Sequence, residues 1–210
     1  MYQLWGKRLC DILVTVPAFV VLWPLLIAIT LLVRMRLGTP VLFRQTRPGL
    51  HGRSFTIFKF RTMTDARDAK GQLLPDPERL TSFGRFLRST SLDELPELWN
   101  VFRGDMSLVG PRPLLTRYYP YFTDEEKSRF LVRPGITGLA QVSGRNDAPW
   151  DARIAADVKY VQELSFALDL RILVLTLQRV VTRQGLQVDP GSVMLDFDEE
   201  RRQREALTRT

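Results

Sequence analysis

The sequence predicts an α+β fold that is mainly helical with a short β-hairpin, behind an N-terminal re-entrant membrane helix hairpin and with interfacial amphipathic helices. Three observations predict it: a 22-residue uncharged run near the N-terminus, one alternating segment between Gly and Pro residues, and later segments with helical spacing of apolar side chains. We expect a membrane anchor over residues 1–36, one globular domain over 37–188, and a charged, disordered tail over 189–210.

The charge balance limits the partners. The chain has 30 Lys and Arg against 23 Asp and Glu, a formal net charge of +7, so an anionic partner is expected. The basic residues are scattered and no nucleic-acid motif is present, which favours anionic lipid over nucleic acid. One cysteine, Cys10, and one histidine, His51, exclude an intramolecular disulfide and a His/Cys zinc cluster. Any catalysis must rest on carboxylates, Lys or Arg.

The uncharged run covers residues 12–33 and is long enough to span a bilayer. It lacks the short apolar core and cleavage site of a signal peptide, so we expect it to remain in the mature protein. Pro24 near its middle should bend the helix into two arms that each rise about 16 Å, half the hydrocarbon thickness. Cations flank both ends, which favours a hairpin returning to the cytoplasmic face. A tilted, kinked transmembrane helix is the alternative.

The next segment predicts two short strands around a Pro-Gly turn region, with alternation over Phe55 to Met63. Lys59 and Arg61 are two residues apart and should project to one face, where two parallel cations can grip a diphosphate. The structural alternative is a cationic edge strand that discourages aggregation.

The segments that follow alternate between exposed and helical patterns. Residues 64–80 are polar with Gly71, Pro75 and Pro77, which predicts an exposed loop. Residues 83–88 have amphipathic helical spacing that suits either a membrane interface or the protein core. Residues 150–183 predict two helices, the second too interrupted by charge to span a membrane. The tail is charged with little apolar content, which predicts disorder.

The stretch "STSLDELPELWN" places Asp93 and Glu94 side by side in a basic chain. Ser91 and Glu94 match a capping box, so both acids could simply begin a helix. Pro96 counts against that register, because a helix capped at Ser91 would need the missing N–H of that proline. With Asp93 as the cap, Pro96 falls in the first turn. Either way the pair lies at a helix N-terminus, whose dipole keeps a carboxylate ionised.

The surroundings of this pair point to chemistry. Asp105, Arg112, Arg133 and Arg145 all lie in Gly- and Pro-rich turn contexts rather than regular helix. Loops held rigid by proline are suited to carrying functional groups. Carboxylates together with several Arg and Lys supply what phosphoryl transfer needs: a nucleophile or base, a metal ligand and cations for the phosphate charge.

Three motifs, "FKFRTM", "LRSTSLDELPELWNVFRGDMSLVGPRP" and "RPGITGLAQVSGR", follow the hydrophobic segment in that order. In this arrangement the chain resembles the small monotopic phosphoglycosyl transferases, the bacterial sugar transferase family, from about residue 5 to 185. The resemblance implies transfer of a sugar 1-phosphate from a UDP-sugar to polyprenyl (undecaprenyl) phosphate, with release of UMP, as the first step of a lipid-linked glycan. It also implies a catalytic domain on the cytoplasmic face of the inner membrane of a bacterium.

The same resemblance implies roles for individual residues. Asp93 corresponds to the nucleophile, which forms a phosphosugar-aspartate intermediate, and Glu94 to a residue that helps to bind Mg²⁺. The residues assigned to substrate phosphates are Lys59, Arg88, Arg112 and Arg145, and Asp157 is assigned as a supporting acid.

One departure from the family pattern concerns the anchor. Trp23 precedes Pro24 where a small polar residue is common, so the bend lies at either Pro24 or Pro17. An inactive membrane-associated scaffold of a glycan assembly complex is the alternative function, although it would not need Asp93, Glu94 and Arg112. The sugar, the pathway, the polyprenol length and the oligomeric state stay open at this point.

Overall fold

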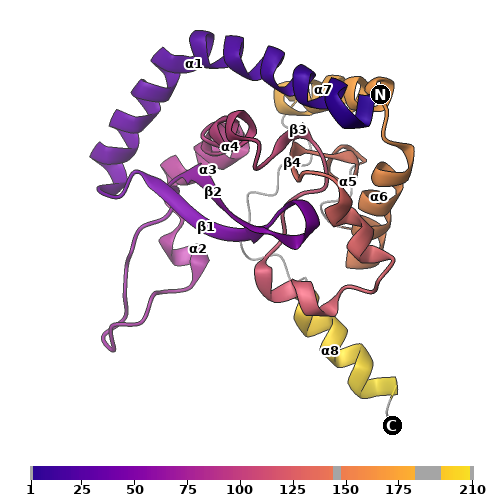
Figure 1. Cartoon of the computed structure of the whole chain (residues 1–210). Coiled ribbons are helices and arrows are strands. Elements are labelled where there is room, and N and C mark those ends of the chain that lie inside the picture. The colour runs from indigo at the N-terminus through magenta and orange to yellow at the C-terminus, as the bar shows by residue number, and fades with distance from the viewer. Residues whose placement is uncertain (1, 144–147, 183–194, 209–210) are drawn as a thin grey trace.

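The computed structural model describes residues 2–143, 148–182 and 195–208. Its longer helices are α1 (Lys7–Leu37), α3 (Ser82–Ser89), α4 (Glu97–Arg103), α6 (Trp150–Glu163), α7 (Phe166–Thr182) and α8 (Phe197–Thr208). Short helices and turns are η1 (Tyr2–Gly6), η2 (Leu50–Gly52), α2 (Asp76–Arg79), η3 (Leu92–Glu94), η4 (Thr116–Tyr121), η5 (Glu126–Leu131) and α5 (Leu139–Val142). The strands are β1 (Leu42–Pro48), β2 (Ser54–Phe60), β3 (Ser107–Val109) and β4 (Gly135–Thr137). Helices α1 and α7 lie along one side of the molecule, and α8 lies at the opposite end (Figure 1).

The N-terminal part of α1 carries a polar face that is buried against the globular body. The Lys7 ammonium lies 2.6 Å from the Asp169 carboxylate of α7. The Asp11 carboxylate accepts hydrogen bonds from the Ser107 hydroxyl at 2.9 Å and from the Leu108 amide at 3.0 Å. Buried charges need such partners, since an unpaired one would be costly. These contacts fix the start of α1 to α7 and β3.

The C-terminal part of α1 returns to the same globular body. Ile29, Val33 and Leu37 are buried and pack with Phe60 of β2 and Leu87 of α3. Figure 1 shows α1 as a curved ribbon that runs past α7 and then turns toward β1. Between the two attached ends, the large apolar side chains left exposed are Leu13, Val14, Val16, Val20, Val21, Trp23, Leu25 and Ile27.

The anchor differs from the sequence prediction in one respect. We expected two arms separated at a proline, whereas residues 7–37 form one continuous helix with Pro17 and Pro24 inside it. A proline in a helix removes one hydrogen bond and bends the helix without ending it. By length and composition α1 is apolar and long enough to cross a membrane.

The predicted β-hairpin is confirmed. Strands β1 and β2 pair antiparallel, with Leu42 opposite Phe60 and Pro48 opposite Ser54. Their turn contains Gly52 and His51, both with positive φ. Ile57 and Phe60 of β2 are buried, so this strand connects the hairpin to the core beneath α1.

A second strand pair, β3 with β4, is parallel and was not expected. Ser107 lies opposite Gly135, and Val109 lies opposite Thr137. The chains approach so closely that a Cβ on Gly135 would lie 2.1 Å from the Gly110 nitrogen. This contact is possible only without a side chain at Gly135. It fixes the chain that leaves β3, which carries Arg112.

The helices after β4 agree with the prediction over 150–182, and the tail does not. Helix α7 buries Asp169 and Ile172 and exposes an apolar stripe of Phe166, Leu170, Val174, Leu177 and Val181. We expected disorder throughout the tail, but residues 197–208 form α8. Phe197 explains the difference, because it is fully buried among aromatic side chains of η4, η5 and α6. One buried ring thus attaches a segment that is otherwise charged.

Candidate active site

Asp93 and Glu94 lie on the short turn η3, just before α4. Ser91 begins this turn with φ 55°, in the left-handed region, and its side chain forms no cap hydrogen bond. The capping-box interpretation of Ser91 is therefore wrong. Pro96 precedes α4, which begins at Glu97. The turn η3 is followed almost directly by α4, and this arrangement brings the carboxyl groups of Asp93, Glu94 and Glu97 close to one another.

Two cations from distant parts of the chain meet these carboxylates. The Lys59 ammonium of β2 lies 2.6 Å from Glu94 Oε1 and 3.0 Å from Glu97 Oε1. The Arg112 guanidinium, which follows β3, lies 2.8 Å from the same Glu94 oxygen. Glu94 thus connects the hairpin and the β3 loop through one carboxylate. Three acids and two cations form a compact, largely buried cluster.

Asp93 differs from its two acidic neighbours. Its side chain makes no hydrogen bond or ion pair within the described residues, although the residue is only 8% exposed. Burial and the adjacent Glu94 raise the pKa of Asp93 to about 6. Burial also raises the pKa of Glu97, to about 7. Asp93 is therefore a carboxylate that is largely ionised at neutral pH and that has no partner in the described part of the chain.

The neighbouring charges have the opposite effect on Glu94. Burial alone would raise the pKa of Glu94, but Arg112 and Lys59 outweigh burial and hold this pKa well below its usual range. Glu94 and Glu97 likewise outweigh the effect of burial on Lys59 and raise the pKa of its ammonium. The Glu94 carboxylate and the Lys59 ammonium stay charged at neutral pH.

The other predicted site residues have different partners in the structure. Arg88 of α3 donates to the Thr62 hydroxyl at 3.1 Å, and its charge acts on Asp93. Arg145 lies outside the described residues. Arg61 does not share the anionic partners of Lys59, because its guanidinium lies 2.6 Å from Asp65. Binding of a diphosphate by Lys59 and Arg61 together stays a prediction.

Asp157 of α6 forms its ion pair with Arg129, outside the cluster around Asp93 and Glu94. Its Oδ2 lies 2.7 Å from the Arg129 guanidinium, and both side chains are almost fully buried. Arg129 also donates to the Arg112 carbonyl oxygen at 2.7 Å. Asp157 thus supports the loop that carries Arg112, and does so through Arg129, a residue that sequence reasoning missed.

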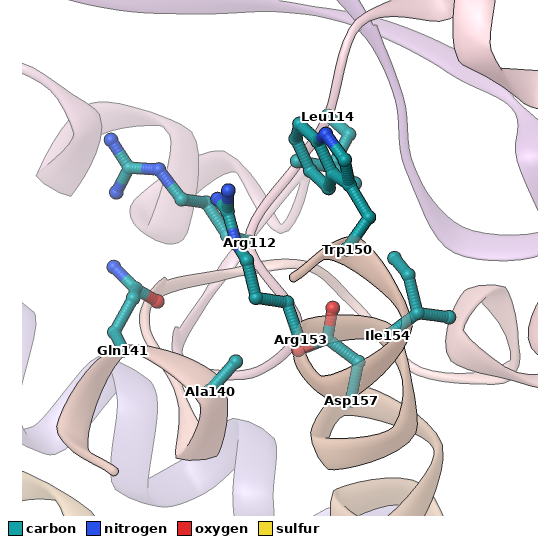
Figure 2. A pocket seen from close by; sticks show the side chains of 8 residues that line it. All are labelled: Arg112, Leu114, Ala140, Gln141, Trp150, Arg153, Ile154 and Asp157. Atoms are coloured by element: carbon teal, nitrogen blue, oxygen red, sulfur yellow. The ribbon is translucent and has the colours of Figure 1, made fainter. Parts of the chain in front are cut away.

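A pocket lies beside Arg112. Figure 2 shows Arg153 extending through the middle of the view toward Arg112, with Gln141 of α5 on the left and Asp157 of α6 on the right. Sequence reasoning did not single out Gln141, Arg153 or Glu97. Only Glu97 had a signal, its position three residues after Glu94, which places two acids on the same side of a helical turn.

The donor set suits a magnesium ion that binds together with substrate. In the described part of the chain, no group of three or more Asp, Glu, His or Cys side chains is placed to hold a metal alone. Glu94 is an ionised oxygen donor, and Lys59 and Arg112 contact only its Oε1. Mg²⁺ usually takes one or two carboxylates and completes its shell with water and phosphates. The residues present therefore fit a Mg²⁺ carried with a diphosphate.

An exposed apolar helix and a buried cluster of carboxylates and cations define the class of protein: a membrane-associated enzyme with a site suited to phosphoryl transfer. Residues 2–183 match the model of the family described as bacterial sugar transferase. The chain belongs to this family and is a phosphoglycosyl transferase.

Several curated relatives agree with this assignment. An uncharacterized sugar transferase, EpsL of Bacillus subtilis, is 56% identical over 155 residues, which cover 74% of this chain and 77% of the relative. The UDP-glucose:undecaprenyl-phosphate glucose-1-phosphate transferase of Xanthomonas campestris is 44% identical over 86% of this chain and 40% of its own length. The Caulobacter vibrioides protein of the same name is 41% identical over 84% of this chain and 70% of its own length.

Proposed function

We propose that this chain transfers a sugar 1-phosphate from a UDP-sugar to undecaprenyl phosphate and releases UMP, through a covalent intermediate on Asp93. The names of the Xanthomonas and Caulobacter relatives support the substrates. One observation carries the proposal: of three clustered carboxylates, Glu94 and Glu97 are paired with cations, whereas Asp93 has no partner among the residues that the structure describes. A carboxylate without a partner is free to attack, whereas its paired neighbours hold the cations in place.

The proposed reaction has two displacements at one phosphorus. A carboxylate oxygen of Asp93 forms a bond to the phosphorus next to the sugar, and the bond to the bridging oxygen breaks so that UMP leaves with the electron pair. An oxygen of undecaprenyl phosphate then attacks the same phosphorus and releases the Asp93 carboxylate. Because UMP leaves before undecaprenyl phosphate reacts with the intermediate, the scheme predicts ping-pong kinetics.

The charged residues of the cluster have separate roles in this scheme. Arg112 and Lys59 offset the negative charge of the diphosphate and orient it toward Asp93. Glu94 would hold Mg²⁺, which when bound supplies positive charge for the leaving phosphate. Arg88 supplies a further positive charge near Asp93, and we assign Arg145 to phosphate binding on the motif alone.

The shape of α1 supports a monotopic arrangement in the membrane. Both ends of α1 contact the same globular body, through Lys7 and Asp11 at one end and Val33 and Leu37 at the other. A straight crossing would place these ends on opposite sides of the bilayer. We therefore propose that α1 enters and leaves by the cytoplasmic face as a curved helix. Asp93 then lies near the headgroups, where a lipid phosphate and a cytosolic nucleotide sugar can both reach it.

The direct test is UMP release from a panel of UDP-sugars by the purified chain with Mg²⁺ and undecaprenyl phosphate. The panel should include glucose, galactose and their N-acetylated amino forms. We expect release with at least one donor, and the formation of a lipid-linked sugar diphosphate that depends on the acceptor. No UMP release from any donor would contradict the proposed function.

The raised pKa of Asp93 predicts an acid limb in the first half-reaction. Asp93 attacks only when ionised, so UMP release without acceptor should fall about tenfold per pH unit below about 6. A single turnover without undecaprenyl phosphate excludes titration of the acceptor. Glu97→Gln removes the neighbouring group whose pKa is about 7. An acid limb that disappears in this variant would assign the titration to Glu97 and contradict the role of Asp93.

A further inference from the structure

The pocket beside Arg112 has a composition that the cluster around Asp93 does not explain. It is a hollow that is partly open to solvent, with Arg112, Gln141, Trp150, Arg153 and Asp157 among its lining residues (Figure 2). Arg112 also contacts Glu94, so the pocket adjoins the charged cluster around Asp93.

Two buried oxygens of this pocket receive no hydrogen bond within the described residues. These are Oε1 of Gln141 and Oδ1 of Asp157. Both side chains are fixed by their other atoms, since Gln141 Nε2 donates to the Ile136 carbonyl at 3.1 Å and Asp157 Oδ2 pairs with Arg129. Buried acceptors are normally satisfied, so two unsatisfied ones in one hollow indicate a ligand or water that donates hydrogen bonds.

Arg153 adds an unpaired positive charge on the same side. Its guanidinium forms no ion pair within the described residues, and it lies over the Trp150 ring at 4.1 Å from the ring centroid. Trp150 is itself held by the residues just before α8, because its indole nitrogen donates to the Leu195 carbonyl at 2.9 Å. Burial and the nearby Arg112 lower the pKa of Arg153. Two neighbouring guanidinium groups, one of them without a carboxylate, favour an anion between them.

We infer that this pocket recognises the hydroxylated ring next to a phosphate of the donor: Gln141 and Asp157 accept hydrogen bonds from ring hydroxyls, and Arg153 binds the phosphate together with Arg112. The inference rests on the proposed function and extends it to donor selection. The ring is either the hexose or the ribose, since both present hydroxyl donors beside a phosphate. A water molecule in the empty enzyme would occupy the same acceptors.

The test compares Gln141→Met with the wild type on the active donor and on analogues that each lack one hydroxyl, on the hexose or on the ribose. In the wild type, loss of the hydroxyl that Gln141 accepts should lower kcat/KM about tenfold or more, because the buried acceptor is left unpaired. Gln141→Met should lose a similar factor on the parent donor and show no further loss with that analogue. A response to a hexose analogue assigns the hexose, and a response to 2′-deoxyuridine donors assigns the ribose.

Three further variants complete the test: two of pocket residues and one control. Gln141→Glu retains Oε1 and should keep the discrimination against the analogue, even if its donation to Ile136 is lost. Arg153→Met retains the apolar contact with Trp150 and should raise KM for the donor about tenfold. Lys159→Met removes an exposed charge from the same helix and should leave KM unchanged.

The outcomes separate the two proposals. Equal penalties for every analogue in the wild type and in Gln141→Met, together with an unchanged KM in Arg153→Met, would overturn the pocket assignment while the transferase activity stands. If Gln141→Met does not fold, the KM of Arg153→Met decides. A wild type that releases no UMP from any donor overturns the proposed function, and the pocket assignment with it.

Discussion

Asp93→Asn is expected to abolish UMP release, with a loss of about 10⁴-fold or more, because the amide cannot form the phosphosugar ester. The substitution should not lower the stability of the folded state. Asp93 makes no hydrogen bond or ion pair within the described residues, and a neutral side chain removes both the cost of burying the charge and the repulsion from Glu94, which together raise the pKa of Asp93. We therefore expect a thermal midpoint equal to that of the wild type or slightly higher.

The covalent intermediate gives a second readout for the same variant. Incubation with the donor and Mg²⁺, without acceptor, should add the mass of a sugar phosphate to the wild-type peptide that contains Asp93 and nothing to Asp93→Asn. Glu94→Gln serves as the control. It also removes one charge, but it weakens the contacts with Lys59 and Arg112, so it should lower stability as well as activity. Full activity in Asp93→Asn, or an adduct on another residue, would exclude Asp93 as the nucleophile.

Arg129→Met is expected to lower the free energy of unfolding by about 3–5 kcal/mol, the usual cost of breaking a buried ion pair from one side. Arg129 and Asp157 pair at 2.7 Å with almost no exposure, so the variant leaves the Asp157 carboxylate buried without its counter-charge. It also removes the hydrogen bond to the Arg112 carbonyl. Urea denaturation in detergent at pH 7 measures this loss.

The pH dependence of Arg129→Met tests the cause of the loss. Burial already raises the pKa of Asp157 in the wild type, and removal of Arg129 should raise it further. An acid with a raised pKa in the folded state binds its proton more readily there, so the variant should recover stability as the pH falls below neutral. Lys127→Met removes an exposed cation nearby and should leave the denaturation midpoint unchanged. Equal midpoint shifts in the two variants would contradict the assignment.

The sequence predicted the parts of the site that depend on local pattern. The alternation over Phe55 to Met63 predicted a strand, and the Gly and Pro residues around Arg112 predicted a rigid loop. The structure brings Lys59, Arg112 and Glu94 together, as expected of one charged cluster. The position of Arg88 near Asp93 agrees with the same expectation.

The parts that sequence reasoning missed depend on contacts between distant residues. The β3 and β4 pairing joins three-residue strands, too short for an alternation pattern, and is made possible by Gly110 and Gly135. The Arg129 and Asp157 pair joins η5 to α6, so neither residue showed its partner. The absence of a cap at Ser91 follows from its left-handed backbone, which a sequence motif does not display.

Residues beyond the end of the family match contribute to the core of this protein. The match ends at residue 183, yet Phe197 is fully buried and stacks on Phe122. Trp150, which lines the pocket beside Arg112, donates its indole hydrogen to Leu195. The unit shared with relatives is therefore shorter than the unit that completes the core. Homology alone would draw the C-terminal boundary too early and would leave one wall of the pocket without its support.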